Sequence, residues 1–259
     1  MTSIGSAHAE TIVIGGTGSA LGVMRMLGES YLQKHPDDTV QVLPSLGSGG
    51  GIRAAVEGKI DIAVTARPPN EEEQAGNLEE HYLARTPLGF VVNGRPKGAN
   101  LTSTQIIDIY AGRVLMWPDG TPIRLVLRPE SESDYRLVTA AIEGLRPIYD
   151  KARSLAGMPV AYTDGENAEL LANMPGAFGT MTLSQLLSGR PYDLTLMSLN
   201  GISPDVESLA EGAYPLWKDY RLIVADTGNA AAKRFLAFID TDEAQDILHK
   251  TGHLTDHGQ

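Results

Sequence analysis

The 259-residue sequence contains no cysteine, which excludes disulfides, thiolate zinc sites, iron–sulfur clusters and cysteine nucleophiles. It also has no apolar run near the roughly 18–20 residues that a membrane helix needs. The longest apolar stretches, such as residues 88–92, have the length of a strand. Basic residues are outnumbered, with 21 Lys and Arg against 32 Asp and Glu. The formal net charge of −11 argues against nucleic acid or an anionic membrane as partner, because both attract a basic surface.

Several catalytic motifs are missing as well. There is no Gly-x-Ser-x-Gly elbow and no Gly-x-x-x-x-Gly-Lys-Ser/Thr loop. Residues 16–22 are similar to a dinucleotide fingerprint, but that site needs an acidic residue at the end of the next strand. This strand ends Val42-Leu43-Pro44-Ser45, and no Tyr-x-x-x-Lys pair is present. An enzyme that acts on a nucleotide or phosphorylated substrate through the Gly-rich loop 15–22 stays open as the alternative function.

What the sequence does contain is one loop design used twice. The apolar run 11–14 is followed by Gly-Gly-Thr-Gly-Ser at 15–19 and a predicted helix from about Ala20. The apolar run 40–43 is followed by a Ser/Gly-rich loop at 45–51 and a predicted helix from Ile52. A helix N-terminus has unpaired N–H groups and about half a positive charge, so it attracts an anion. Glycine permits close approach and hydroxyls add donors, so the two loops predict a site for a small anion.

The order of these segments indicates the fold class. Residues 10–88 alternate between strand and helix patterns, which is typical of a parallel sheet with its ligand crevice at the carboxyl ends of the strands. The third predicted strand, residues 60–64, leads directly into Thr65 and Arg67. Arg67 is either a ligand contact or a surface arginine.

A second arginine also follows a predicted strand. Arg128 comes after residues 123–127, where a ligand-facing residue belongs, and its planar guanidinium suits an oxyanion. Ser131 and Ser133 follow at a predicted helix start. The alternative role for Arg128 is a surface ion pair.

With these residues in place, the chain resembles the phosphate-binding class of periplasmic solute-binding proteins, which supply ABC transporters. The resemblance rests on an ordered set of short motifs along nearly the whole chain: residues 47–52 with 58–62, 101–112, 117–123 leading to Arg128, 175–179, 201–204 and 212–216.

The resemblance implies a type II binding-protein fold of the α/β class. Two lobes, each a mixed sheet flanked by helices, would be joined by two crossover strands and would close on the ligand. We expect one lobe to comprise residues 10–88 plus 193–259 and the other residues 89–192, with hinges near 86–92 and 192–196. No catalytic residue, cofactor or metal ion is expected. The ligand contacts implied are Thr17, Gly18, Ser19, Ala20, Ser48, Gly49, Thr65, Arg67, Arg128, Ser131, Glu132 and Ser133.

The sequence departs from the family pattern beside Arg128. Phosphate binders usually carry Ser-Gly-Thr shortly after this arginine, whereas here Glu132 and Asp134 lie inside the expected anion loop. Some also carry an Asp after the third strand, where this chain has Ala66. Either Glu132 or Asp134 accepts a proton from the ligand, or both point outward as first-turn acids favoured by the helix dipole. A third possibility is that the ligand is not phosphate.

The partners and location follow from the same resemblance. We expect a small oxyanion ligand, an ABC-transporter permease as partner, no nucleic acid, and a monomer. Residues 6–9 end in the Ala-x-Ala pattern of a signal-peptidase site, although the charged and apolar parts of a signal peptide are missing. Together with the family, this predicts a periplasmic or extracellular protein. A sensory or adhesive module with the same fold is not distinguished by sequence.

Overall fold

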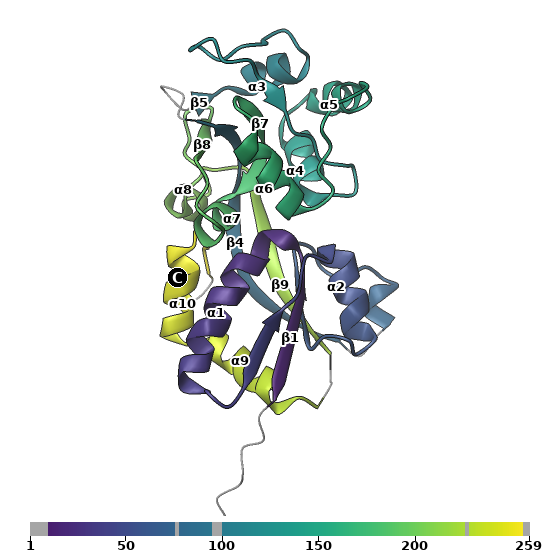
Figure 1. The fold of residues 1–259 in the computed structure, drawn as a ribbon, viewed down its shortest axis with the longest axis vertical. Coiled ribbons are helices and arrows are strands. Elements are labelled where there is room, and N and C mark those ends of the chain that lie inside the picture. The colour runs from purple at the N-terminus through teal and green to yellow at the C-terminus, as the bar shows by residue number, and fades with distance from the viewer. Residues whose placement is uncertain (1–9, 76–77, 95–99, 226–227, 256–259) are drawn as a thin grey trace, which may run out of the picture. The chain divides into compact units, whose positions relative to one another are not determined.

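The computed structural model describes residues 10–75, 78–94, 100–225 and 228–255, so the Ala-x-Ala segment lies outside the described residues. The chain divides into two compact units (Figure 1). Unit 1 comprises Met1–Leu83 and Tyr220–Leu248, and unit 2 comprises Ala84–Asp219 and His249–Gln259. Both units combine strands and helices, so the predicted α/β fold class is confirmed.

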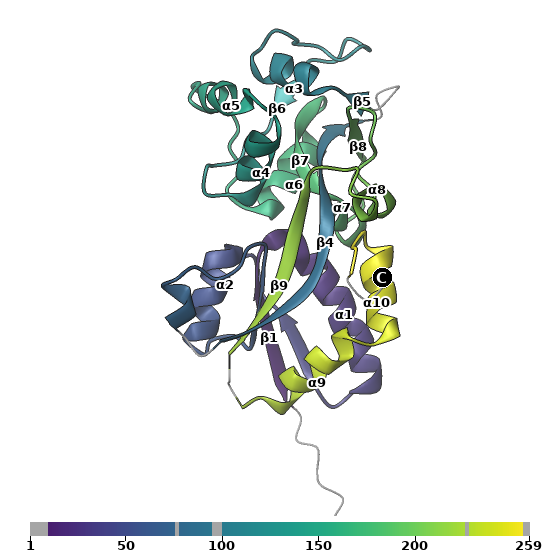
Figure 2. The same cartoon turned by 180° about the vertical axis from the view of Figure 1, so that it is seen from behind.

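Unit 1 is built on a sheet with the strand order β2-β1-β3-β9. Its central strand β1 (Thr11–Gly16) is parallel to β2 (Thr39–Val42) and to β3 (Ile62–Thr65), while β3 is antiparallel to β9 (Trp217–Ala225). The connection through α1 (Leu21–Lys34) leads to one side of β1, and the connection through α2 (Gly47–Val56) leads to the other side. Right-handed crossovers therefore place the two helices on opposite faces of the sheet (Figures 1 and 2).

Alternation along β1 matches this two-sided packing. Ile12 and Ile14 are buried, and Val13 between them packs instead with Ile52 and Ala55 of α2. Successive side chains of a strand point to opposite faces, so one short apolar strand serves both helix layers. Helix α1 has an apolar face formed by Leu21, Met24, Leu27 and Tyr31, and this face is buried. The unit is completed by η1 (Gly18–Ala20), η2 (Glu73–Ala75), α9 (Ala230–Ile239) and most of α10 (Asp242–Lys250).

Unit 2 contains a mixed sheet. β4 (Leu78–Asn93) pairs antiparallel with β7 (Ala177–Thr182) and with β8 (Leu194–Leu199). β6 (Arg124–Leu125) is parallel to β7, and β5 (Asn100–Leu101) is parallel to β8. The helices of this unit are α3 (Ser103–Tyr110), α4 (Ser133–Ala141), α5 (Leu145–Arg153), α6 (Asp164–Asn173), α7 (Leu183–Ser188) and α8 (Val206–Ala210).

Two strands carry the chain between the units, but one of them is not the predicted one. The chain changes unit within β4 and within β9, and again after Leu248. The predicted hinge at 192–196 lies inside unit 2, because β8 pairs there with β4. The predicted boundaries at residues 88 and 193 therefore differ from the observed division at 83 and 220.

One predicted loop is also shorter than expected. Helix α2 begins at Gly47, so Ser48 and Gly49 belong to its first turn rather than to a loop that ends before Ile52. Glycine has low intrinsic helix propensity, which led to the later predicted start. Packing overrides that propensity here, because a Cβ on Gly51 would lie 2.8 Å from the Gly16 Cα.

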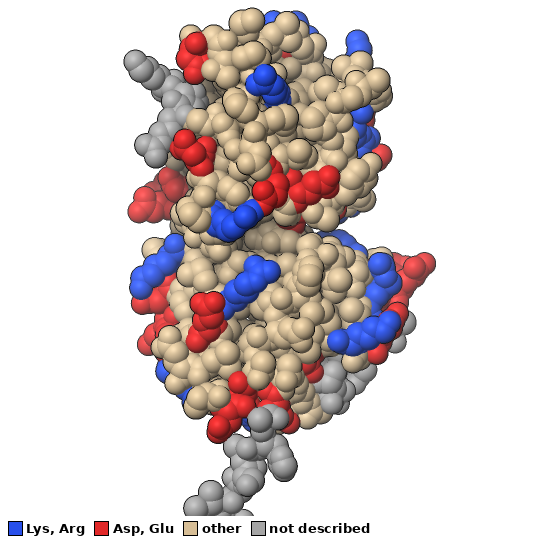
Figure 3. All heavy atoms as spheres, in the orientation of Figure 1, with Lys and Arg blue, Asp and Glu red and all other residues tan. Residues whose placement is uncertain are grey.

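Charge is spread over both units. On the face drawn in Figure 3, basic and acidic side chains are interspersed over each unit. No helix among the described residues is both long and apolar enough to cross a membrane.

The end of β1 generates a stability prediction. Gly16 has φ +134°, and a Cβ there would lie 1.9 Å from the Val64 carbonyl oxygen. We expect Gly16→Ala to cost about 3 kcal/mol or more in the free energy of unfolding, because strain and a backbone clash add together. Gly58→Ala is the matched control, since Gly58 has φ +64° with open space around its Cα, and it should cost about 1–2 kcal/mol. Urea denaturation measures both, and equal losses would contradict the proposed clash.

Candidate functional site

In unit 1 the two Gly/hydroxyl segments meet at the carboxyl ends of β1 and β3. The Thr17 N–H donates to the Val64 carbonyl at 2.9 Å, and the Leu46 N–H donates to the Gly16 carbonyl at 3.0 Å. The close approach of Gly51 to Gly16 brings α2 against the same strand end. The start of η1 and α1 and the start of α2 therefore lie side by side.

The N-cap residues of these helix starts make no side-chain capping hydrogen bond, and the start of α2 has a long contact of 3.4 Å in which Ser45 Oγ accepts the Gly47 N–H. No side chain of Thr17, Ala20 or Leu46 makes a capping hydrogen bond, and neither α1 nor α2 has an acidic residue in its first turn. By contrast, α3, α6, α7 and α8 begin at Thr or Asp residues whose side chains accept a backbone N–H. The uncapped starts keep backbone donors and the positive end of the helix dipole available for an anion.

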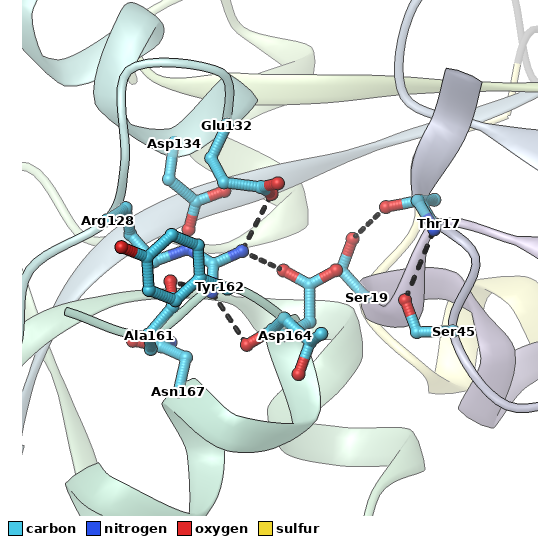
Figure 4. A network of polar contacts seen from close by, with 12 residues as sticks. Thr17, Ser19, Ser45, Arg128, Glu132, Asp134, Ala161, Tyr162, Asp164 and Asn167 are labelled. Carbon is cyan, nitrogen blue, oxygen red and sulfur yellow. Dashed lines mark hydrogen bonds and ion pairs between the residues drawn. The ribbon is translucent and has the colours of Figure 1, made fainter. Parts of the chain in front are cut away.

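The predicted hydroxyl groups of unit 1 have different roles. Thr17 Oγ1 and Ser19 Oγ lie 3.2 Å apart, as Figure 4 shows. Ser48 Oγ accepts the Ala66 N–H at 3.0 Å, so its own proton can still be donated. Thr65 Oγ1 donates to the Arg67 carbonyl at 2.8 Å, so its proton is used within the loop. Ser48 is thus a better placed donor than Thr65.

Arg67 is held by its own loop. Its two terminal nitrogens each donate to one carboxylate oxygen of Glu73 at 2.7 Å, and Nη1 also donates to the Pro68 carbonyl at 2.9 Å. These hydrogen bonds lower the pKa of the Glu73 carboxyl. Gly49 lies close by, since a Cβ there would lie 3.2 Å from Arg67 Nη2. In this structure Arg67 orders the loop beside α2 through Glu73.

In unit 2 the predicted residue Arg128 lies at the centre of a polar cluster. Its side chain is 0% exposed. Nη1 donates to the carbonyls of Ala161 and Thr163 at 3.0 and 2.7 Å. Nη2 donates to Glu132 at 2.7 Å and to Asp164 at 3.1 Å (Figure 4). The predicted alternative, a surface ion pair, is therefore wrong, because Arg128 is a buried cation.

A second buried cation supports the same cluster. Lys218 forms an ion pair with Asp134 and lies 4.0 Å from Asp164, and Asp134 also accepts a hydrogen bond from Thr180 at 3.0 Å. Burial alone would raise the pKa of Asp134, but the charges of Lys218 and Arg128 outweigh it and hold that pKa below its ordinary value. Arg128 and Lys218 thus face Glu132, Asp134 and Asp164, which leaves the ionised cluster with an excess of one negative charge.

These contacts show whether the carboxylates of Glu132 and Asp134 point outward, as one of the two expected alternatives requires. Asp134 does not point outward, because it is buried in the first turn of α4 and paired with Lys218. Glu132 precedes α4, which begins at Ser133, but its side chain pairs with Arg128 instead of capping the helix. The Glu132 side chain is 28% exposed. Burial raises the pKa of the Glu132 carboxyl against the opposing effect of Arg128. Ser131, by contrast, is exposed.

Sequence reasoning did not find Lys218, Asp164 or Tyr149, whose hydroxyl accepts the Arg128 N–H at 2.8 Å. For Lys218 a signal existed. Leu216, Lys218, Tyr220 and Leu222 alternate along one chain segment and are all buried. A lysine on the buried face of a strand requires a buried acidic partner, because an unpaired charge there is costly. Asp164 lies in the first turn of α6, where acidic residues are common, so its position in the sequence does not indicate a contact with Arg128. No group of three His, Cys, Asp or Glu side chains within the described ranges is arranged to hold a metal ion.

The fold and these residues define a class of protein with two α/β units joined by two strands. The profile of the PBP superfamily domain matches residues 2–243, and the chain belongs to that superfamily. The predicted resemblance is thereby confirmed.

Relatives and solved structures agree with this placement. The chain is 24% identical over 257 residues to the phosphate-binding protein PstS of Bacillus subtilis (strain 168), covering 96% of this chain and 79% of that one. A putative phosphate ABC transporter substrate-binding protein with bound phosphate from Clostridium perfringens shares the fold, with a TM-score of 0.77, 21% identity, and coverage of 95% of this chain and 99% of that one. An ABC-type phosphate transport receptor from Vibrio cholerae has a TM-score of 0.60 and 24% identity, with the same coverage.

The buried pair of Lys218 and Asp134 generates a pH-dependent prediction. We expect Lys218→Met to lower the free energy of unfolding by about 3–5 kcal/mol at pH 7.5, because Asp134 keeps a buried charge without its main partner. The folded-state pKa of Asp134 is depressed, so the stability from this pairing is present above the unfolded pKa and is lost as pH falls through the folded one. The deficit of the variant should therefore shrink below about pH 4.

Urea unfolding at several pH values measures this effect. Lys233→Met, at an exposed lysine of α9, is the control and should change stability little at any pH. A deficit that is the same at neutral and acidic pH would show that Lys218 acts by packing rather than by charge.

Proposed function

We propose that this chain is an extracytoplasmic solute-binding protein that captures a small oxyanion, phosphate or a related anion, for uptake by an ABC transporter. Membership of the PBP superfamily supports a binding rather than a catalytic role. The relative from Bacillus subtilis is a phosphate-binding protein, and the similar protein from Clostridium perfringens holds bound phosphate. We further propose that the protein acts as a monomer and delivers its ligand to a permease.

The observation that carries this proposal is the pair of uncapped helix starts in unit 1. The starts of η1, α1 and α2 meet at the ends of β1 and β3 without an acidic residue in the first turn and without a capping hydrogen bond from an N-cap side chain. Neutral backbone donors and hydroxyls can surround an oxyanion without a full counter-charge, so they select shape and hydrogen-bonding pattern. Thr17, Gly18, Ser19, Ala20, Ser48 and Gly49 are the proposed contacts.

Arg128 is the proposed anion contact of unit 2. Four of its hydrogen bonds are already made to fixed acceptors, which lock the guanidinium in one orientation. Glu132 is the acceptor with the most exposure to solvent among its charged partners. We therefore propose that Glu132 competes with the ligand for Arg128, and that Ser131 and Ser133 contribute less.

A charge placed at the start of α2 tests the function. The unmodified protein is first screened by thermal shift against phosphate, sulfate, arsenate, phosphite, molybdate and organic phosphates. A ligand present at a hundred times its Kd raises the free energy of unfolding by about 2.7 kcal/mol. Ser48→Asp retains an acceptor for the Ala66 N–H and favours the helix dipole, so it should leave stability unchanged or higher. The variant should bind the oxyanion identified in this screen more than about a hundredfold more weakly, because the introduced carboxylate would repel the anionic ligand.

Ser48→Asn, a neutral isostere, is the control and should weaken binding far less. Unchanged affinity of Ser48→Asp would show that the start of α2 does not contact the ligand. The absence of a thermal shift with every oxyanion would overturn the proposed function. Saturable quenching by NADP(H) would favour the alternative, an enzyme acting through loop 15–22.

Glu132 generates a prediction of opposite sign. We expect Glu132→Gln to bind phosphate about tenfold more tightly at pH 8, because the substitution removes the negative charge of Glu132 that competes with the ligand for Arg128. Burial raises the pKa of Glu132, so the unmodified protein protonates this group at a higher pH than an ordinary glutamate. The advantage of the variant should therefore disappear as pH falls through that pKa. Calorimetry measures the affinity of both proteins at each pH. The titration of phosphate affects both affinities equally and cancels in their ratio.

Glu130→Gln is the matched control, because Glu130 is exposed and lies 3.8 Å from Arg153 rather than beside Arg128. Its affinity should follow the unmodified protein at every pH. Weaker phosphate binding by Glu132→Gln would instead mean that Glu132 accepts a proton from the ligand.

A further inference from the structure

Unit 2 contains a cavity that the proposed oxyanion function does not use. It has a volume of about 780 Å³ and is lined by the end of α3, the following turn at 111–115, β6, α5 and residues 155–159. Figure 2 shows α3, α5 and β6 in this part of the chain. Cavities of roughly 300–1,000 Å³ are typical of sites for small organic ligands, and a small inorganic oxyanion fills only a fraction of such a volume.

The walls of the cavity are apolar. Apart from Gly112 and three basic residues, every lining side chain is aliphatic or aromatic, or belongs to methionine or proline. Two of these side chains are unusually open to solvent, since Leu115 is 65% exposed and Leu155 is 55% exposed. Apolar side chains that remain exposed around a concave surface mark a binding site more often than an ordinary surface.

The charge of the lining is opposite to that of the chain. Arg113, Arg124 and Lys151 line the cavity and no acidic residue does, whereas the whole sequence has a formal net charge of −11. Arg113 is neutralised by Asp108 at 2.6 Å, and Arg124 donates to the Pro175 carbonyl. The structure records no ion pair for the Lys151 ammonium group with any described residue. A local positive charge beside an apolar wall attracts a molecule with an anionic head and an apolar chain.

We propose that this cavity binds a single-chain amphiphile with an anionic head group, such as a medium-chain fatty acid. The chain would lie against the apolar side chains of α3 and α5, among them Ile109 and Ile148, and the carboxylate would lie near Lys151. Leu155 follows the end of α5 at Arg153, lines the same cavity as Lys151, and provides an apolar contact for the chain of the ligand. This site is independent of the oxyanion contacts, because it shares no residue with them.

The test uses the full chain and the fluorescent fatty acid 11-(dansylamino)undecanoate below its micelle concentration. We expect a saturable rise in fluorescence with one probe per chain, reversed by dodecanoate and unaffected by inorganic phosphate. Dodecyltrimethylammonium, with an equal chain and the opposite charge, should not displace the probe. Lys151→Glu and Leu155→Ser should each weaken probe binding roughly three- to tenfold. Lys233→Glu, the same charge change at an exposed residue of α9, should leave it unchanged.

Other results would overturn the proposal. Equal displacement by dodecyltrimethylammonium would show that charge has no role, and unchanged binding by Lys151→Glu would remove the proposed head-group contact. Capture of the chain by phosphatidylglycerol vesicles without binding of the monomeric probe would mean that the surface docks on a membrane instead. A dimer in sedimentation that dissociates in Leu155→Ser, again without probe binding, would mean that a second copy covers it.

Discussion

The complete burial of Arg128 is the constraint on which unit 2 depends. A guanidinium removed from water is tolerated only when its charge and donors are matched, and two carbonyls and two carboxylates match them here. A second buried cation, Lys218 of β9, lies 4.0 Å from one of these carboxylates, Asp164, and pairs with a third carboxylate, Asp134. One buried cation therefore fixes the positions of α4, α6 and β9 within unit 2.

The anion site proposed in unit 1 would depend on the opposite kind of chemistry. Its candidate contacts are backbone N–H groups, hydroxyls and helix dipoles, and the nearby guanidinium of Arg67 is paired with Glu73. Such a site depends on backbone geometry more than on side-chain charge. Gly16 and Gly51 are essential to it because any side chain at these positions would separate the two helix starts.

The sequence predicted features that depend on near neighbours and missed those that depend on distant ones. The apolar stripe of α1 and the loops after β1 and β2 follow from local periodicity and composition, as does Arg128 at a strand end. Lys218 lies 84 positions from Asp134 and Asp164 lies 36 from Arg128, so their pairing arises only from the tertiary fold. The early start of α2 has the same origin, because contact with Gly16 requires the glycines that lower helix propensity.

The excess negative charge of the Arg128 cluster limits which ligand state it can serve. An anion brought to a cluster with two cations and three carboxylates gains little unless one carboxylate is neutralised or moves away. Asp134 and Asp164 are buried and held, so Glu132, which is partly exposed and has a raised pKa, is the group able to respond. A protonated Glu132 becomes a donor to an anion while releasing Arg128, whereas an ionised Glu132 can only accept a proton that the ligand carries. At the proposed site in unit 2, recognition would therefore depend on the number of protons shared between Glu132 and the ligand, rather than on the charge of the ligand alone.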